Sequence, residues 1–190
     1  MPLEKTVEDK PETEEVVEDP YITNTFDYIE ELVDDLGLPE EVSEAAKNSV
    51  EKLDIRIRQH YEAGYMAAAT VQLESRKLDA AHPRTIKQVS TSLESILETE
   101  NHLTGKTNYK KKTNRTVKKL KKHQDIRLKP ELSEDYLPRL LKEFELGQEV
   151  QDTAWNILKE VRGSQELQGK CQMGIAAAFT YIAAEEHGKE

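Results

Sequence analysis

The side chains that could do chemistry in this sequence are concentrated in one basic segment, residues 106–129. It holds eleven lysine and arginine residues against one acid, Asp125, although the whole chain of 190 residues has a net charge of −10. Because charges are screened beyond about 8 Å at physiological salt, such a segment acts locally and can attract a phosphate backbone in an otherwise acidic protein. The composition therefore indicates a polyanion-binding segment, and the residues leave a solvated helix face or a mobile loop open as the alternative.

Helical spacing gives this segment a definite geometry. In a helix over residues 110–123, Val117 and Leu120 turn toward the interior and the basic side chains share one broad outer face. Like charges this close repel one another, so a purely stabilising role is disfavoured. We expect contacts to nucleic-acid phosphates from Lys110, Lys111, Lys112, Arg115, Lys118, Lys119 and Lys122.

Other chemistries find little support in the sequence. Gly105-Lys106-Thr107 is similar to the end of a phosphate-binding loop, but Glu100 stands where the leading glycine belongs and no strand precedes it. The five histidines lack metal-ligand spacing, and no Ser-His-Asp or paired-carboxylate pattern stands out. Cys171 has no base partner in the sequence, so we expect a small buried residue at a helix start. Because it is the single cysteine, it cannot form an internal disulfide, which indicates a reducing, intracellular environment. These observations predict a non-enzymatic protein without a metal or cofactor.

The elements that must position the basic segment are helices. Residues 1–20 contain eight acids, two bases and three prolines, which predicts a disordered tail that we extend to residue 22. No apolar run approaches the roughly 20 residues that span a bilayer. Apolar residues then recur with helical spacing, which predicts an all-α chain. The expected helices cover 25–36, 39–57, 64–78, a stretch opening at 83–89, 110–123, 133–144, 148–161 and 171–186, with a loop or insertion at about 94–108.

Further expectations concern the second half of the chain. We expect Ser133 to cap the helix 133–144 and Phe144 to lie on the inner face of that helix. We also expect the alanine triplet 176–178 to occupy a crowded packing site. Trp155 falls among the inward positions of its helix or beside them, which is typical of a core residue.

The two halves of the chain carry the same pattern. When the second half is aligned with the first at an offset of 108 residues, residues 144–150 match 36–42. At an offset one residue larger, Ala176-Ala177-Ala178 matches Ala67-Ala68-Ala69. Small side chains allow neighbouring helices to approach closely. The repeat therefore predicts a duplicated helical unit, in which each third helix is the hub of its own bundle.

Four stretches of the duplicated unit carry a further signal: Leu36–Val42, Ala67–Ala69 with Pro83–Thr85, Leu128–Pro130 with Glu134–Arg139, and Gly169–Ala184. With these stretches, the unit resembles the cyclin-like repeat of the transcription factor IIB family, and its archaeal members most closely. The resemblance implies two cyclin-like repeats over about residues 24–188. The first repeat would cover 23–127 with five helices and the insertion at about 94–108, and the second 128–190, truncated after three helices.

The resemblance also implies a function. It implies a transcription initiation factor that binds a complex of TATA-binding protein and promoter DNA, with RNA polymerase machinery as a further partner, in the cytoplasm of a prokaryotic-type cell beside the nucleoid. The partner-binding residues near the inter-repeat cleft would be Arg127, Lys129, Tyr136 and Arg139.

Two departures from the family pattern keep other functions open. No cysteine precedes Cys171, so we expect no zinc ribbon for polymerase recruitment, and the chain stops at Glu190, where the helix-turn-helix of the second repeat would begin. The alternatives are a protein-only cyclin-like adaptor or regulatory paralogue without DNA binding, and an inactive fragment of a longer gene product.

Overall fold

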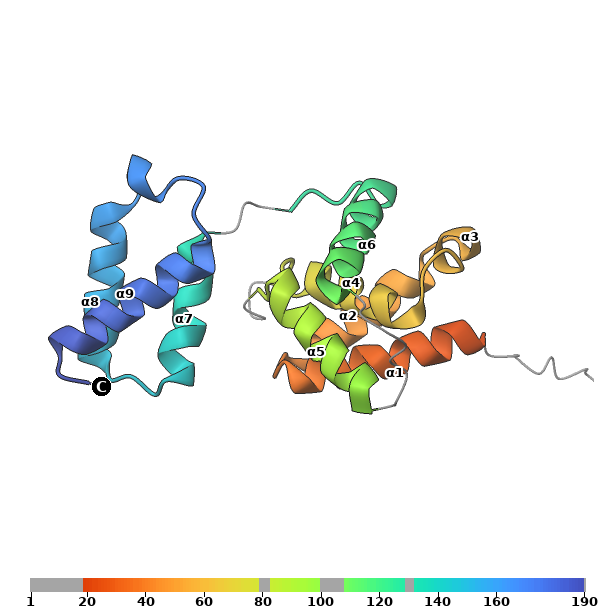
Figure 1. Ribbon diagram of the computed structural model, residues 1–190, viewed down its shortest axis with the longest axis horizontal. Coiled ribbons are helices and arrows are strands. Elements are labelled where there is room, and N and C mark those ends of the chain that lie inside the picture. Colours follow the sequence, from red (N-terminus) through yellow and green to blue (C-terminus); the bar gives the residue numbers. More distant parts are fainter. Residues whose placement is uncertain (1–18, 79–82, 100–107, 129–131, 190) are drawn as a thin grey trace, which may run out of the picture.

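The computed structural model describes residues 19–78, 83–99, 108–128 and 132–189, and every regular element in these residues is a helix. The helices form two groups, α1 to α6 and α7 to α9 (Figure 1). The all-α prediction is therefore confirmed. The elements are α1 (Pro20–Asp35), α2 (Glu40–Glu51), α3 (Ile55–Arg58), α4 (Ala63–Glu74), α5 (Ile86–Thr99), α6 (Tyr109–His123), α7 (Ser133–Glu143), α8 (Gln148–Val161), the 3-10 turn η2 (Gln165–Leu167) and α9 (Gln172–Glu186).

Helix α4 is the centre of the first group. It packs against α1, α2, α5 and α6, and every residue from Gly64 to Glu74 is buried. Its alanine triplet, residues 67–69, is fully buried, because small side chains let four neighbouring helices approach one axis. Gly64 serves the same purpose, since a Cβ atom there would lie 3.1 Å from the Cδ1 atom of Leu93 on α5.

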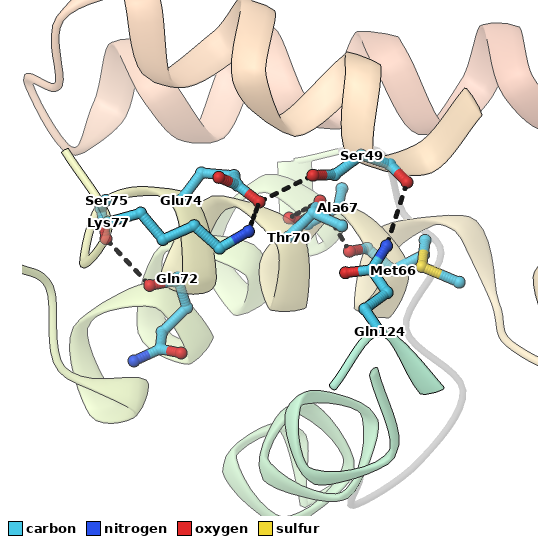
Figure 2. A network of polar contacts seen from close by, with 9 residues as sticks. All are labelled: Ser49, Met66, Ala67, Thr70, Gln72, Glu74, Ser75, Lys77 and Gln124. Carbon is cyan, nitrogen blue, oxygen red and sulfur yellow. Dashed lines mark hydrogen bonds and ion pairs between the residues drawn. The ribbon is translucent and has the colours of Figure 1, made fainter. Parts of the chain in front are cut away.

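A polar network closes the C-terminal end of α4 (Figure 2). The carboxylate of Glu74 accepts hydrogen bonds from Ser49 Oγ at 2.7 Å and from Lys77 Nζ at 2.6 Å. The carbonyl oxygen of Ser49 accepts a hydrogen bond from the side-chain amide of Gln124 at 3.4 Å. These bonds satisfy a buried carboxylate and connect α2 and α4 to the residue that follows α6.

The second group packs α7 and α8 against α9. Its core is apolar, with Leu137 and Leu141 from α7, Val150 and Leu158 from α8, and Phe179 from α9. Trp155 is partly buried against this core, in keeping with the expectation for that residue.

The internal repeat is visible in the backbone. The sequence match pairs Gln148 with Glu40, which are the first residues of α8 and α2, and at the offset one residue larger it pairs the first residues of α9 and α4. Between the first and second helices of each unit, Gly37 has a φ of 56° and Glu145 a φ of 50°. Each unit also closes the first helix with equivalent backbone hydrogen bonds, from Leu38 N to Val33 O at 2.9 Å and from Leu146 N to Leu141 O at 3.1 Å.

The boundary between tail and first helix needs a correction. Helix α1 begins at Pro20, so residues 20–22 are helical and do not belong to a tail that ends at residue 22. The carboxylate of Asp19 caps this helix by accepting a hydrogen bond from Tyr21 N at 3.0 Å, and the Tyr21 side chain packs against the first core. The disorder predicted for the rest of the tail falls on residues 1–18, which lie outside the described residues.

Two further boundaries differ from expectation in the first group. The insertion expected at 94–108 is wrong for residues 94–99, which continue α5 because Ile96 and Leu97 pack against the first core. Residues 100–107 lie outside the described part of the chain. The helix expected over 39–57 ends at Glu51, and a separate turn, α3, starts after Asp54, whose carboxylate accepts a hydrogen bond from Arg56 N at 2.8 Å.

Several predictions for the second group are wrong in detail. Leu132 is the N-cap of α7 in place of Ser133, and its backbone N–H donates to the carboxylate of Asp135 at 2.8 Å. Phe144 is not on the inner face, because α7 ends at Glu143 and the Phe144 side chain is 63% exposed. Cys171 precedes α9 but is exposed. Within the alanine triplet only Ala176 is buried, so the crowded site expected at 176–178 is absent at two of its three positions.

Candidate nucleic-acid interface

Helix α6 presents one apolar and one basic face. Val117 and Leu120 are buried in the first core, as predicted, and the helix packs against α4 and α5. Asn108 caps the N-terminus, because its side chain accepts a hydrogen bond from Lys111 N at 2.9 Å. The apolar face fixes the helix on the bundle, and this leaves the opposite face to solvent.

The seven basic residues predicted to contact nucleic acid all lie on this helix with none of them buried. The structure separates them into groups. Lys110 lies at the N-terminal end, beside Lys87 of α5. Lys111 and Lys122 are exposed outside the grooves described for this helix. The other four, Lys112, Arg115, Lys118 and Lys119, line one groove of about 570 Å³.

This groove, which we call the α6 groove, runs between α6 and the connection from α3 to α4. Its opposite wall consists of His60, Tyr61 and Glu62, with Tyr65 at the start of α4. The ammonium group of Lys112 lies 4.8 Å from the centre of the Tyr65 ring, and that of Lys119 lies 5.8 Å from the centre of the Tyr61 ring. Cations over aromatic faces are attracted to the ring electrons and keep their charge.

The charges in the α6 groove are unbalanced. Lys112 forms an ion pair with Glu62 at 3.1 Å, and this hydrogen bond raises the pKa of Lys112. Among the described residues, Arg115, Lys118 and Lys119 have no carboxylate partner. Burial raises the pKa of Tyr61 and of Tyr65, so both phenols are neutral at physiological pH. The groove therefore has four cations against one carboxylate, which suits an anionic ligand.

Sequence reasoning missed the aromatic wall of the groove. Tyr61 and Tyr65 stand four residues apart, which in a helix would put them on one face, but the sequence did not indicate that this stretch lies beside the basic helix. Tyr65 also stacks on Tyr109, the first residue of α6, with ring centres 6.1 Å apart. That contact brings the two segments together, and a long-range contact of this kind leaves no signal in local spacing.

The four residues expected to bind a partner near the inter-repeat cleft are not equivalent. The side chain of Arg127 is 90% exposed, and Lys129 lies outside the described residues. Tyr136 and Arg139 are buried in the second group at 1% and 5% exposure.

Arg139 forms an ion pair with Glu143 at 3.3 Å and contacts the sulfur of Met173 at 3.9 Å. Its Nε and Nη1 atoms are buried without a hydrogen bond of good geometry among the described residues.

Arg84 also belongs to this region. Its guanidinium donates to the carbonyl oxygen of Leu36 at 2.6 Å, and burial, with a further contribution from the positive charge of Arg139, lowers the pKa of Arg84 to about 10. Arg84 is therefore still charged at physiological pH. The burial of Tyr136, Arg139 and Arg84 favours a role in packing for all three side chains in this conformation.

The described residues contain no group of three or more His, Cys, Asp or Glu side chains that could hold a metal ion. None of the helices in the same residues is long and apolar enough to cross a membrane.

Comparison with known proteins covers most of the chain. The sequence model of a protein family, the transcription factor TFIIB repeat, matches residues 127–190. Transcription initiation factor IIB of Methanothermococcus thermolithotrophicus is 30% identical over 164 residues, which cover 84% of this chain and 43% of that protein. The corresponding factor of Archaeoglobus fulgidus is 29% identical over 160 residues, or 82% and 44% of the two chains. Transcription initiation factor IIB 2 of Thermoplasma acidophilum is 27% identical over 158 residues, or 81% and 46%.

These matches agree with the duplicated helical architecture. The chain spans less than half the length of these relatives. The match to the repeat model covers α7, α8 and α9, and the alignments to the relatives extend over most of the chain. From the repeat model, the relatives and the helical fold together, we conclude that the chain belongs to the transcription factor IIB family.

Proposed function

We propose that this protein acts in transcription initiation as a binding protein without catalysis, and that it contacts a complex of TATA-binding protein and promoter DNA. The observation that carries the proposal is the row of solvent-accessible basic side chains on α6, in a chain whose relatives are transcription initiation factors. Four of these side chains converge on the α6 groove, where they face a single carboxylate.

The chemistry of the groove favours the DNA backbone over the base edges. Lysine and arginine neutralise phosphates and release counterions, so affinity falls steeply with salt and depends little on sequence. The ammonium and guanidinium groups on one helix face can bind successive phosphates of a DNA strand. Any preference for particular promoters would then come from the partner protein or from the shape of the DNA.

The experiment uses a pair of charge variants. Replacing Arg115 and Lys119 together by alanine removes two exposed charges of the groove and leaves the buried face of α6 unchanged. Affinity for promoter duplex, with TATA-binding protein present, should fall. The slope of log affinity against log salt should flatten by about two, because each neutralised phosphate contributes roughly −0.9. Sequence preference should not change.

A matched control removes two charges elsewhere. Lys159 and Lys170 are exposed on the second group, and their double replacement by alanine changes the net charge by the same amount. This control should leave the salt slope unchanged. If the Arg115 and Lys119 variant also keeps the wild-type slope, α6 does not contact DNA.

That outcome would favour the protein-only adaptor. A specific feature supports this second candidate, since Phe144, Tyr181 and Ile182 expose apolar surface in the second group. An exposed apolar surface of this kind is typical of a protein-binding site. Binding of TATA-binding protein without DNA, measured by titration calorimetry on the wild-type chain, would then be the discriminating measurement.

A further inference from the structure

The α6 groove contains more positive charge than the described residues neutralise. Lys112 already has Glu62 as its partner. Arg115, Lys118 and Lys119 have no carboxylate beside them in the described part of the chain. An anionic segment could therefore bind beside these three side chains without displacing the ion pair between Lys112 and Glu62.

The start of α1 lies close to this groove. Tyr21, in the first turn of α1, packs against the first core together with Tyr61, which forms part of the groove wall. Tyr21 is also within electrostatic range of both Tyr61 and Arg58. Helix α1 therefore begins at the end of the bundle that adjoins the groove, on the same side as α3 (Figure 1).

The chain that precedes this point is acidic. Residues 1–18 contain seven acids and two bases. Eighteen residues reach at most about 65 Å when extended, since one residue spans at most 3.3–3.6 Å. Because the segment is tethered beside the groove, its effective concentration there is on the order of millimolar, so even weak charge pairing would occupy the groove for much of the time.

We propose that the acidic segment 1–18 docks in the α6 groove of its own chain and competes there with the DNA backbone. The docking rests on charge complementarity and on the attachment point of the segment, whereas its regulatory consequence rests on the proposed function. Phosphates that bind α6 would first have to displace the segment. Duplex affinity would therefore increase when the acids of the segment are neutralised.

Docking can be tested without DNA. Carbodiimide treatment of the full wild-type chain joins carboxylates to lysine amines that are in direct contact, and mass spectrometry identifies the joined peptides. A mixture of isotopically labelled and unlabelled chains separates links within a chain from links between chains. We expect links within a chain from Glu12, Glu14 or Glu15 to Lys118 or Lys119, which disappear at high salt.

The same experiment can overturn the proposal. Lys159 and Lys170 are exposed lysines of the second group and serve as internal controls. If the acids of segment 1–18 link to these lysines as often as to Lys118 and Lys119, or form no link to the groove, the segment does not dock there.

Competition with DNA is measured on two full-length variants of equal charge. One replaces four acids of the segment by glutamine, and the other replaces four acids of the second group. We expect duplex affinity to rise about threefold or more in the first variant and less than about twofold in the second, because charges remote from the groove are screened. The substitutions are Glu8→Gln, Glu12→Gln, Glu14→Gln and Glu15→Gln in the first, and Glu160→Gln, Glu166→Gln, Glu185→Gln and Glu186→Gln in the second.

The outcomes separate this inference from the proposed function. If no form of the chain binds duplex, the proposed function is wrong, and the cross-links alone decide whether the segment docks. If duplex binding depends on α6 but both quadruple variants bind equally, the proposed function stands and the competition is wrong.

Discussion

Helices α4 and α9 occupy equivalent places in the two repeats, yet their surroundings differ. Every residue of α4 from Gly64 onward is buried, whereas α9 buries five residues, all on one side, including Ala176 and Phe179. Both helices carry an alanine triplet and apolar residues around most of the circumference. The sequence of a helix therefore does not decide how much of it is buried, because that depends on which neighbours are present.

The neighbours account for the difference. Helix α4 packs against α1, α2, α5 and α6, whereas α9 packs mainly against α7 and α8. The described residues contain no counterparts of α5 and α6 in the second group. The face of α9 that corresponds to the covered face of α4 is therefore open. On this open face Tyr181 is 67% exposed and Ile182 is 41% exposed. Substitutions at equivalent positions can test this comparison directly.

The largest effect is expected for a matched pair of truncations, Leu73→Ala on α4 and Ile182→Ala on α9. Leu73 is 1% exposed and Ile182 is 41% exposed, although the repeat places them at equivalent positions. Leu73→Ala should lower the free energy of unfolding by about 2–5 kcal/mol, because it leaves a cavity. Ile182→Ala should cost less than about 1 kcal/mol. Urea unfolding followed by circular dichroism measures both, and equal losses would show that α9 is covered as completely as α4.

Much of the architecture behind this comparison could be predicted from sequence. The register between the two repeats and the apolar faces of α1, α2 and α8 are patterns within short stretches of chain. The basic face of α6 could be predicted for the same reason. Val117 and Leu120 define the inner side of that helix, so the basic residues between them must lie outside.

The features that sequence could not give depend on contacts between distant segments. The open side of α9 is one of them, since its alanine triplet looks the same as that of α4. The aromatic wall of the α6 groove is another, because Tyr61 meets Lys119 only after α4 and α6 have packed. The burial of Arg139 also follows from packing within the second group, because the structure brings its guanidinium to the sulfur of Met173 on α9.

A second matched pair tests the alanine triplets themselves. Ala68 is fully buried on α4, and the equivalent Ala177 is exposed on α9. Ala68→Leu should overpack the first core and cost about 1–3 kcal/mol, whereas Ala177→Leu should change stability by less than about 0.5 kcal/mol. Leucine and alanine are both good helix formers, so helix propensity does not obscure the result. Thermal melts of the two variants suffice, and a large loss for Ala177→Leu would mean that this face is packed.

The third comparison uses the turn that both repeats share. Gly37 and Glu145 both have positive φ, at 56° and 50°, and only glycine adopts this conformation without a steric penalty. Glu145→Gly should therefore stabilise the second repeat by about 0.5–1 kcal/mol, and Gly37→Ala should destabilise the first repeat by a similar amount. Urea unfolding measures the two opposite signs. Destabilisation by Glu145→Gly would show that the Glu145 side chain makes contacts that outweigh the strained backbone.

The smallest change in stability is expected where the open face is most exposed. Phe144 and Tyr181 line a hollow of about 820 Å³ beside the C-terminal half of α9, together with Leu146 and Ala184. Because Phe144 and Tyr181 are 63% and 67% exposed, replacing both by serine should change the free energy of unfolding by less than about 0.5 kcal/mol. The same double variant should lose most of the binding of a hydrophobic fluorescent dye, since these rings supply the apolar surface of the hollow. A matched double variant on the solvated side of α8, Asn156→Ser with Lys159→Ser, should keep the dye signal. Strong destabilisation by the Phe144 and Tyr181 changes would contradict an open face, because it would mean that both rings pack against the core of the second repeat.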